Sequence, residues 1–292
     1  MMQAPRLRRS VLYVPASNDK ALAKLASLSC DAVVIDLEDA VAPGEKAAAR
    51  EKLAKILGNR PAGVREIVVR VNALSSEWGA DDLAAAIACR PDGILLPKVE
   101  TPRDVLEAGD LLDEAGAPES LRLWAMVETP RGLMNLGAIA ELGRDANPRL
   151  SCLVAGTNDL AAMTGVLATP DRRYLMPWLM QMVLAARAGG LDMLDGVSND
   201  FRDLDAFAAE CGHGAAMGFD GKTLIHPAQI APAEAAFSPS PAALAEAERI
   251  VAAFALPENA GKGAIGLDGR MVELLHCVQA ERLLAKAAMI AK

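Results

Sequence analysis

The chain alternates short apolar runs with helix-like segments, and this alternation constrains its fold more than any other feature. Strands that alternate with helices imply parallel pairing through right-handed crossovers. Eight such units within about 240 residues predict a (β/α)8 TIM barrel, with a doubly wound sheet as the alternative. The runs expected to form strands are Val11–Val14, Ala32–Leu37, Glu66–Val71, Gly93–Pro97, Arg122–Val127, Leu150–Ala155, Leu191–Val197 and Ala215–Phe219.

Helices are expected between these strands. Hydrophobic residues make up 52% of the chain but aromatic residues only 3%, which suits helices packed in layers on parallel strands. The expected helices are Asp19–Leu28, Glu45–Leu57, Ala80–Cys89, Pro102–Ala115, Gly132–Leu142, Arg172–Ala188 and Phe201–Cys211.

The pattern changes after Pro227. Two helices, Ala228–Ala236 and Pro241–Ala255, are expected to lead into the glycine-rich stretch Gly261–Gly269, and a closing helix to span Arg270–Lys292. The glycines predict a mobile connector, which is either a plain linker or a functional loop. We therefore expect a barrel domain over residues 1–238 and a C-terminal helical extension over residues 239–292.

Charge and cysteine content exclude several classes of protein. The net charge of −8 argues against a nucleic-acid-binding surface, which would be basic. The five cysteines are scattered without a CxxC pair, so we expect neither a disulfide framework nor a zinc site. The N-terminus lacks the apolar core of a signal peptide, and the longest uncharged apolar run, residues 174–186, is too short to cross a bilayer. These features predict a cytoplasmic protein with no nucleic-acid or membrane partner.

Polar residues gather where the expected strands end. Barrel enzymes build their sites from the loops that follow the carboxyl ends of the strands, so these residues are the candidates for chemistry. They are Asp36, Glu38, Asp39, Arg70, Asn72, Lys98, Glu100, Glu128, Asp159, Asp195, Asn199, Asp220, Lys222 and His226.

Glu128 and Asp159 are the best candidate metal ligands. Each follows an apolar strand, and the two strands are neighbours in the expected order. Two carboxylates, completed by water and substrate oxygens, form the ligand set that Mg²⁺ favours. The three histidines are far apart in the sequence, which argues against zinc. Helix capping or a salt bridge at the rim is the alternative role for each acid.

Arg70 ends an apolar strand, where an unpaired charge is unfavourable. Its planar guanidinium suits a substrate carboxylate or thioester oxygen. The alternative is a structural ion pair with Asp36, Glu38 or Asp39. These three acids could instead orient metal-bound water as an outer shell of the metal site.

Seven segments, taken in order, resemble the HpcH/HpaI aldolase/citrate lyase family, and most closely its citrate lyase β-subunit and malyl-CoA lyase branch. The similarity runs from about residue 8 to residue 287, so it covers nearly the whole chain. The segments are Arg9–Pro15, Asp31–Val41, Arg70–Asn72, Leu96–Glu100, Glu128–Gly132, Gly156–Leu160 and Gly218–Pro227.

The resemblance implies a (β/α)8 barrel that assembles as a homotrimer or a dimer of trimers (a hexamer). It implies Mg²⁺, or Mn²⁺, on Glu128 and Asp159, with Arg70 binding substrate and Glu128 also touching it. In such lyases the C-terminal segment can lie over the site of a neighbouring subunit and supply a catalytic aspartate. The matching residue here is Glu273, and Ala16 stands where the family has glycine in Val-Pro-Gly. The first departure leaves the acid/base assignment and the preferred reaction open.

The activity implied by the resemblance is a magnesium-dependent carbon–carbon lyase. It would cleave or form a 3-hydroxy-3-carboxyacyl-CoA, such as malyl-CoA, methylmalyl-CoA or citramalyl-CoA, to or from an acyl-CoA and a 2-oxoacid. Arg70 would stabilise the enolate that develops on the thioester oxygen, and Glu273, from a partner chain, would move the proton. Three alternatives stay open: a malyl-CoA thioesterase, a citrate lyase β-type subunit that acts on acyl-carrier thioesters, and a pyruvate aldolase that does not use CoA.

Overall fold

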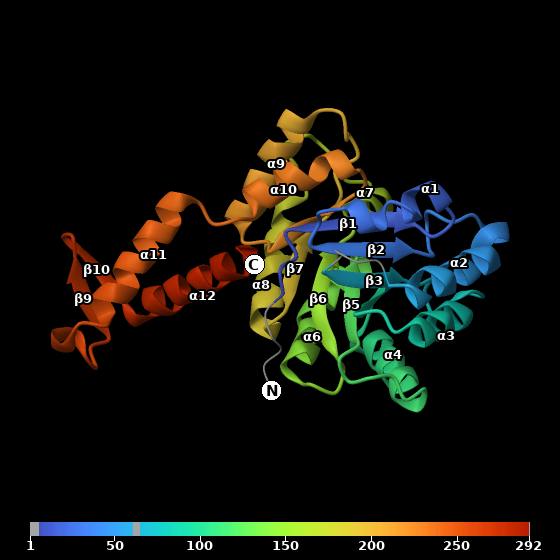
Figure 1. The fold of residues 1–292 in the computed structure, drawn as a ribbon, viewed down its shortest axis with the longest axis horizontal. Helices are drawn as coiled ribbons and strands as arrows, with labels where there is room; N and C mark the ends of the chain where they lie inside the picture. The colour runs from blue at the N-terminus through green and yellow to red at the C-terminus, as the bar shows by residue number, and fades with distance from the viewer. Residues whose placement is uncertain (1–5, 61–64, 292) are drawn as a thin grey trace. The chain divides into compact units, whose positions relative to one another are not determined.

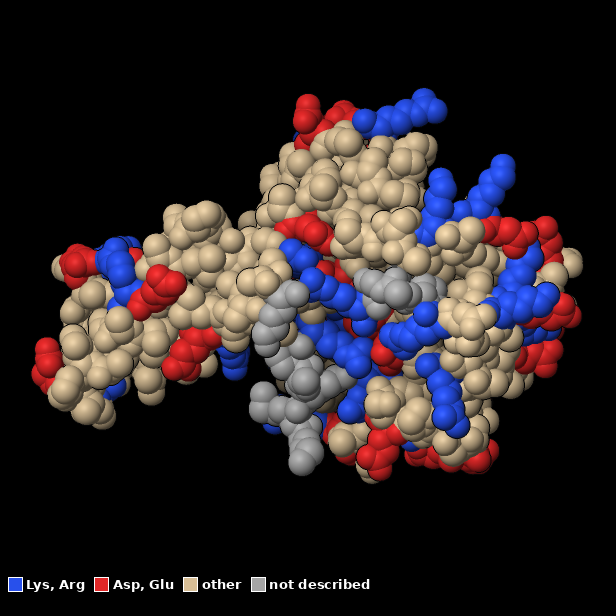
Figure 2. All heavy atoms as spheres, viewed as in Figure 1, with Lys and Arg blue, Asp and Glu red and all other residues tan. Residues whose placement is uncertain are grey.

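The computed structural model describes residues 6–60 and 65–291 (Figure 1). Contacts divide these residues into a barrel unit, residues 8–237, and a C-terminal unit, residues 238–291 together with residues 6 and 7. Figure 2 shows Lys and Arg interspersed with Asp and Glu on the viewed face of the barrel unit. No described helix is long and apolar enough to cross a membrane.

Eight parallel strands close into a barrel in which each pairs with the next and β8 returns to β1. This confirms the predicted (β/α)8 fold with its C-terminal helices. The register between the second and third strands runs from Ala32 opposite Glu66 to Asp36 opposite Arg70, so the last two side chains lie next to each other. The strands are β1 (Ser10–Pro15), β2 (Ala32–Asp36), β3 (Glu66–Arg70), β4 (Gly93–Leu96), β5 (Arg122–Val127), β6 (Leu150–Ala155), β7 (Asp192–Asp195) and β8 (Gly221–Leu224).

Helices surround this barrel (Figure 1). Apolar side chains form one layer inside the barrel and a larger one between strands and helices, because strand side chains alternate between the two faces. The α-helices are α1 (Asp19–Leu22), α2 (Lys46–Gly58), α3 (Gly79–Cys89), α4 (Pro102–Glu114), α5 (Pro130–Met134), α6 (Leu136–Glu141), α7 (Thr157–Thr164), α8 (Met176–Gly189), α9 (Leu204–Met217) and α10 (Ile230–Ala236). Short 3₁₀ helices are η1 (Leu25–Ser27), η2 (Pro43–Glu45), η3 (Leu142–Arg144) and η4 (Pro227–Gln229).

The prediction of the eighth strand was wrong. Residues 215–217 are the end of helix α9, and residues 218 and 219 belong to the loop that follows it. Strand β8 begins only at Gly221. A short apolar run does not by itself distinguish a buried helix end from a buried strand. Gly218 adopts φ +98°, the left-handed conformation that commonly ends a helix. Helix α7 was not predicted.

The C-terminal unit contains α11 (Pro241–Phe254), η5 (Pro257–Asn259), β9 (Ala264–Leu267), β10 (Arg270–Glu273) and α12 (Leu274–Ile290). The prediction of a mobile connector followed by a helix from Arg270 was wrong, because β9 and β10 pair as an antiparallel hairpin. Asp268 and Gly269 both have positive φ, which is the backbone that a tight two-residue hairpin turn requires.

Candidate active site

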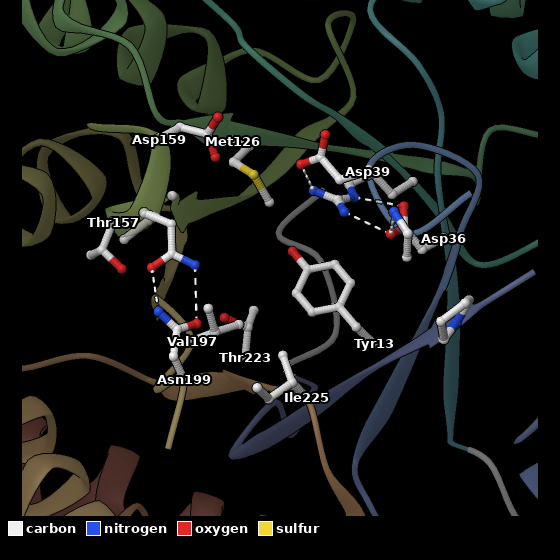
Figure 3. Close-up of a pocket in the computed structure, with 16 residues that line it drawn as sticks. Tyr13, Asp36, Asp39, Met126, Thr157, Asp159, Val197, Asn199, Thr223 and Ile225 are labelled. Atoms are coloured by element: carbon white, nitrogen blue, oxygen red, sulfur yellow. Dashed lines mark hydrogen bonds and ion pairs between the residues drawn. The ribbon is translucent and has the colours of Figure 1, made fainter. Parts of the chain in front are cut away.

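A cavity of about 410 Å³ opens at the carboxyl ends of the barrel strands (Figure 3). All its lining residues belong to the barrel unit. They are Tyr13, Pro15, Asp36, Asp39, Ala40, Arg70, Met126, Ala155, Gly156, Thr157, Asn158, Asp159, Val197, Asn199, Thr223 and Ile225.

Of the two candidate metal ligands, Asp159 lines this cavity, and Glu128 is buried against Gly156, which is one of the lining residues. Glu128 follows β5 and is buried, and its Oε1 accepts a hydrogen bond from the backbone N–H of Lys98 at 2.7 Å. Asp159 lies in the first turn of α7 and lines the cavity. Gly156, just before α7, lies so close that an added Cβ would be 2.2 Å from Glu128 Cβ and 2.8 Å from its Oε2. The missing side chain at Gly156 therefore lets the start of α7, and Asp159 with it, approach Glu128.

The electrostatics of Glu128 fit a cation. Burial raises the pKa of its carboxyl to about 7, and the negative charges of Glu38 and Asp159 add to this rise, while the Lys98 N–H opposes it. None of the described residues donates a hydrogen bond to Oε2, so this oxygen is available to a ligand. Among the described residues no group of three His, Cys, Asp or Glu could hold a metal. A bound Mg²⁺ would therefore take its other ligands from water and substrate, as this ion commonly does.

Arg70 has carboxylate partners as well as access to the cavity. Its Nε and Nη2 each donate to Asp36 at 2.7 Å, in a bidentate pair. Its Nη1 lies 2.9 Å from Glu38 and 3.6 Å from Asp39. The guanidinium also sits over the ring of Tyr13, with Cζ 5.0 Å from the ring centroid. The three acids thus surround Arg70 and fix its orientation at the cavity wall.

Lys98 is a residue of this site whose role the sequence did not reveal. Its φ of +51° is in the left-handed region, which is unfavourable for a side chain with a Cβ. This backbone conformation accompanies the hydrogen bond from its N–H to Glu128, while its Nζ contacts Glu38 Oε1. Lys98 therefore links the candidate metal ligand to the ion cluster around Arg70. Its position after a strand was visible in the sequence, but its backbone conformation was not.

Two further predicted rim residues do lie near the mouth. Asn199 lines the cavity and exchanges two amide hydrogen bonds with Asn158, at 2.9 and 3.1 Å (Figure 3). His226 is exposed and stacks on Phe201, with ring centroids 4.8 Å apart.

Three other residues predicted at the rim lie elsewhere. Lys222 and Asp195 are fully buried, 2.9 Å apart, and join Arg172 and Glu210 in an ion cluster that does not line the cavity. Asp220 precedes β8 and therefore lies at the opposite end of the strand, where it accepts from the backbone N–H of Met193. The misplaced eighth strand explains the errors at Asp220 and Lys222.

Glu273 belongs to the C-terminal unit and not to the residues that line the cavity. It stands at the N-cap of α12, where its backbone N–H donates to His276 Nδ1 at 2.9 Å. Its role as an acid/base stays a prediction.

The model of the HpcH/HpaI aldolase/citrate lyase family matches residues 9–227. The chain is 48% identical over 283 residues to a (3S)-malyl-CoA thioesterase of Cereibacter sphaeroides, covering 97% of this chain and 95% of the relative. It is 36% identical to the mitochondrial citramalyl-CoA lyase of Homo sapiens, covering 97% and 86%. The crystal structure of protein CitE from Mycobacterium tuberculosis with magnesium, acetoacetate and coenzyme A matches with a TM-score of 0.76 at 32% identity, covering 96% and 97%.

Proposed function

Because this chain belongs to the HpcH/HpaI aldolase/citrate lyase family, we propose that it is a magnesium-dependent enzyme acting on a 3-hydroxy-3-carboxyacyl-CoA, with malyl-CoA as the first candidate. One observation carries the proposal. The buried Glu128 lies against the lining residue Gly156 and is close enough to the cavity-lining Asp159 for its charge to raise the pKa of Glu128, while the oriented Arg70 lines the same cavity. The magnesium in the related CitE structure supports Mg²⁺ at this pair, and Mn²⁺ has the same preference for carboxylate oxygens.

Each of these residues has a separate proposed role. Glu128 and Asp159 would hold the ion, which when bound would stabilise negative charge on the acyl oxygens. Arg70, held by Asp36 and Glu38, would present its guanidinium to a carboxylate or thioester oxygen of the substrate. Asp36, Asp39 and Asp159 line the cavity, so their negative charges would repel the carboxylate of the substrate unless a cation were bound there.

The 48% identity to a malyl-CoA thioesterase favours hydrolysis of malyl-CoA to malate and CoA. Carbon–carbon cleavage to acetyl-CoA and glyoxylate is the second candidate, supported by the citramalyl-CoA lyase relative. For that reaction we propose Glu273 of a neighbouring subunit as the acid/base in a homotrimer or hexamer. Glu at this position in place of the family's Asp adds one methylene, which makes cleavage the weaker candidate.

The two reactions are separated by their products. The purified chain is incubated with Mg²⁺ and malyl-CoA, free thiol is measured, and all products are identified by mass spectrometry. Hydrolysis gives thiol and malate in equal amounts without glyoxylate, whereas cleavage gives acetyl-CoA and glyoxylate without thiol. Turnover of the free CoA ester would also dismiss a role limited to acyl-carrier thioesters. No turnover of malyl-CoA, methylmalyl-CoA or citramalyl-CoA would refute the proposal.

A further inference from the structure

Tyr13 places a hydroxyl without a protein partner in the cavity. The residue lies on β1, packs against the apolar layer inside the barrel and lines the cavity wall. Its hydroxyl oxygen is buried, and no described residue forms a hydrogen bond with it. Figure 3 shows the hydroxyl pointing into the cavity, toward the side where Met126 and Asp39 lie. A buried hydroxyl without a partner is unfavourable, so the position is explained best by a ligand that completes it.

The surroundings fix the direction of this hydroxyl. The Arg70 guanidinium lies over the ring, 5.0 Å from its centroid, and limits its movement. The carboxylate of Asp36 is already engaged by Arg70 and by the backbone N–H groups of Glu38 and Ala40. Glu38 is engaged by Arg70 and Lys98. Glu38 Oε2 is held by the ion pair with Arg70 and forms no hydrogen bond with the Tyr13 hydroxyl, which is left for a group that enters the cavity.

The hydroxyl keeps its proton at neutral pH and can therefore donate a hydrogen bond. Burial and the neighbouring carboxylates raise the pKa of Tyr13 well above its ordinary value, although the charge of Arg70 opposes this. It is thus a neutral donor in a wall that also carries Asp36, Asp39 and Asp159. Such a donor suits an oxygen that carries or develops negative charge.

We propose that the Tyr13 hydroxyl donates a hydrogen bond to an oxygen of the acyl group bound in the cavity, and so helps to select hydroxy-acid thioesters. The inference deepens the proposed function and rests on it for the identity of the substrate. It concerns the acyl group alone, so binding of CoA is independent of this hydroxyl.

The test is Tyr13→Phe, which removes the hydroxyl and keeps the ring over Arg70. The matched control is Tyr174→Phe, since Tyr174 is half exposed and lies outside the cavity. We expect Tyr13→Phe to lower kcat/KM for malyl-CoA by about 10- to 100-fold, the loss typical of a hydrogen bond to a charged group. Inhibition by free CoA should stay within about twofold of the wild type, and so should all values for Tyr174→Phe.

Thermal unfolding without ligand separates this role from a structural one. Since Tyr13→Phe removes an unpaired buried hydroxyl, its melting temperature should equal or exceed that of the wild type. Unchanged kcat/KM, an equal loss of CoA binding, or a lower melting temperature would each overturn the inference.

A failure of the proposed function is recognised separately. If the wild type turns over no CoA ester, the hydroxyl contact is tested by measuring malate binding in the presence of Mg²⁺ by calorimetry. Weaker malate binding by Tyr13→Phe than by the wild type would support the hydroxyl contact. Equal binding by the two proteins, or binding by neither, would overturn it.

Discussion

The raised pKa of Glu128 gives the candidate metal site a defined pH dependence. Mg²⁺ binds the ionised carboxylate. The pKa of the buried carboxyl is about 7, so at a lower pH the group is mostly protonated. We therefore expect the affinity for Mg²⁺ to rise about tenfold per pH unit up to pH 7 and then to level off. Calorimetric titration of Mg²⁺ between about pH 5.5 and 8 measures this. Glu128→Gln should lose the dependence together with most of the affinity, and an affinity independent of pH in the wild type would contradict the account.

The same shift predicts how stability varies when the metal is absent. The folded protein keeps the Glu128 proton up to about pH 7, whereas the unfolded chain releases it near the ordinary value of 4.5. Between these values the folded state binds more protons, so this group's contribution to the free energy of unfolding falls as pH rises. Urea unfolding with EDTA should show a larger loss of stability between about pH 5 and 7 in the wild type than in Glu128→Gln. Identical slopes would show that the carboxyl is not buried as described.

Lys98 offers a test of backbone strain. Lys98→Ala and Lys98→Gly both remove the contact to Glu38, but only glycine accepts φ +51° without strain. The glycine variant should therefore be more stable than the alanine variant by about 1 kcal/mol in urea unfolding. The opposite order would mean that the left-handed conformation at this position is not maintained.

Part of the candidate site could be predicted from the sequence, residue by residue. Strand ends placed Asp159 and Arg70 at one mouth, because the carboxyl ends of parallel strands share an edge. The ion partners of Arg70 were foreseen as an alternative, since a buried guanidinium needs them. The link through Lys98 and the unpaired hydroxyl of Tyr13 depend on a dihedral angle and on packing, which no residue pattern encodes.

At the level of elements, the junction between β6 and α7 controls the approach of Asp159 to Glu128. Gly156→Ala would put a Cβ 2.2 Å from that of Glu128, so one of the two segments must move. We expect at least a tenfold loss of Mg²⁺ affinity in calorimetry, the result of a displaced ligand. Gly137→Ala in α6 is the control, because an added Cβ there meets nothing within 4 Å. It should keep the affinity and leave stability equal or up to about 1 kcal/mol higher. Equal affinities in both variants would refute the role of this junction.

The elements that were predicted well have a clear pattern of apolar residues and clear signals at the residues where they begin or end. Strands β2, β4 and β5 are continuous buried runs, and α4 begins with a Thr101–Asp104 capping box. The eighth strand was misplaced because Gly221–Leu224 holds the buried Lys222, whose partners Asp195 and Glu210 are distant in sequence. The hairpin β9–β10 was missed because its glycines were interpreted as a connector, although Asp268-Gly269 is a strong turn signal.

For the whole molecule, eight alternating strand–helix units favoured a barrel over a doubly wound sheet, and the closed eight-stranded sheet confirms that prediction. Closure gives every strand a partner on both edges. The assembly is a separate matter. The family resemblance predicts a trimer or a hexamer, so sedimentation equilibrium should give three or six times the mass of the chain. A monomer at micromolar concentration would contradict this and would remove Glu273 of a neighbour from the proposed chemistry.

The most direct test of the central claim is the turnover of malyl-CoA by protein that has been stripped with EDTA and then titrated with Mg²⁺. Glu128→Ala and Asp159→Ala are measured alongside the wild type, and circular dichroism checks that each variant is folded. We predict that the stripped wild type is inactive and regains activity as Mg²⁺ is added, whereas neither variant does. Full activity of the stripped wild type, or of both variants, would contradict a metal held by these two acids at the mouth of the barrel.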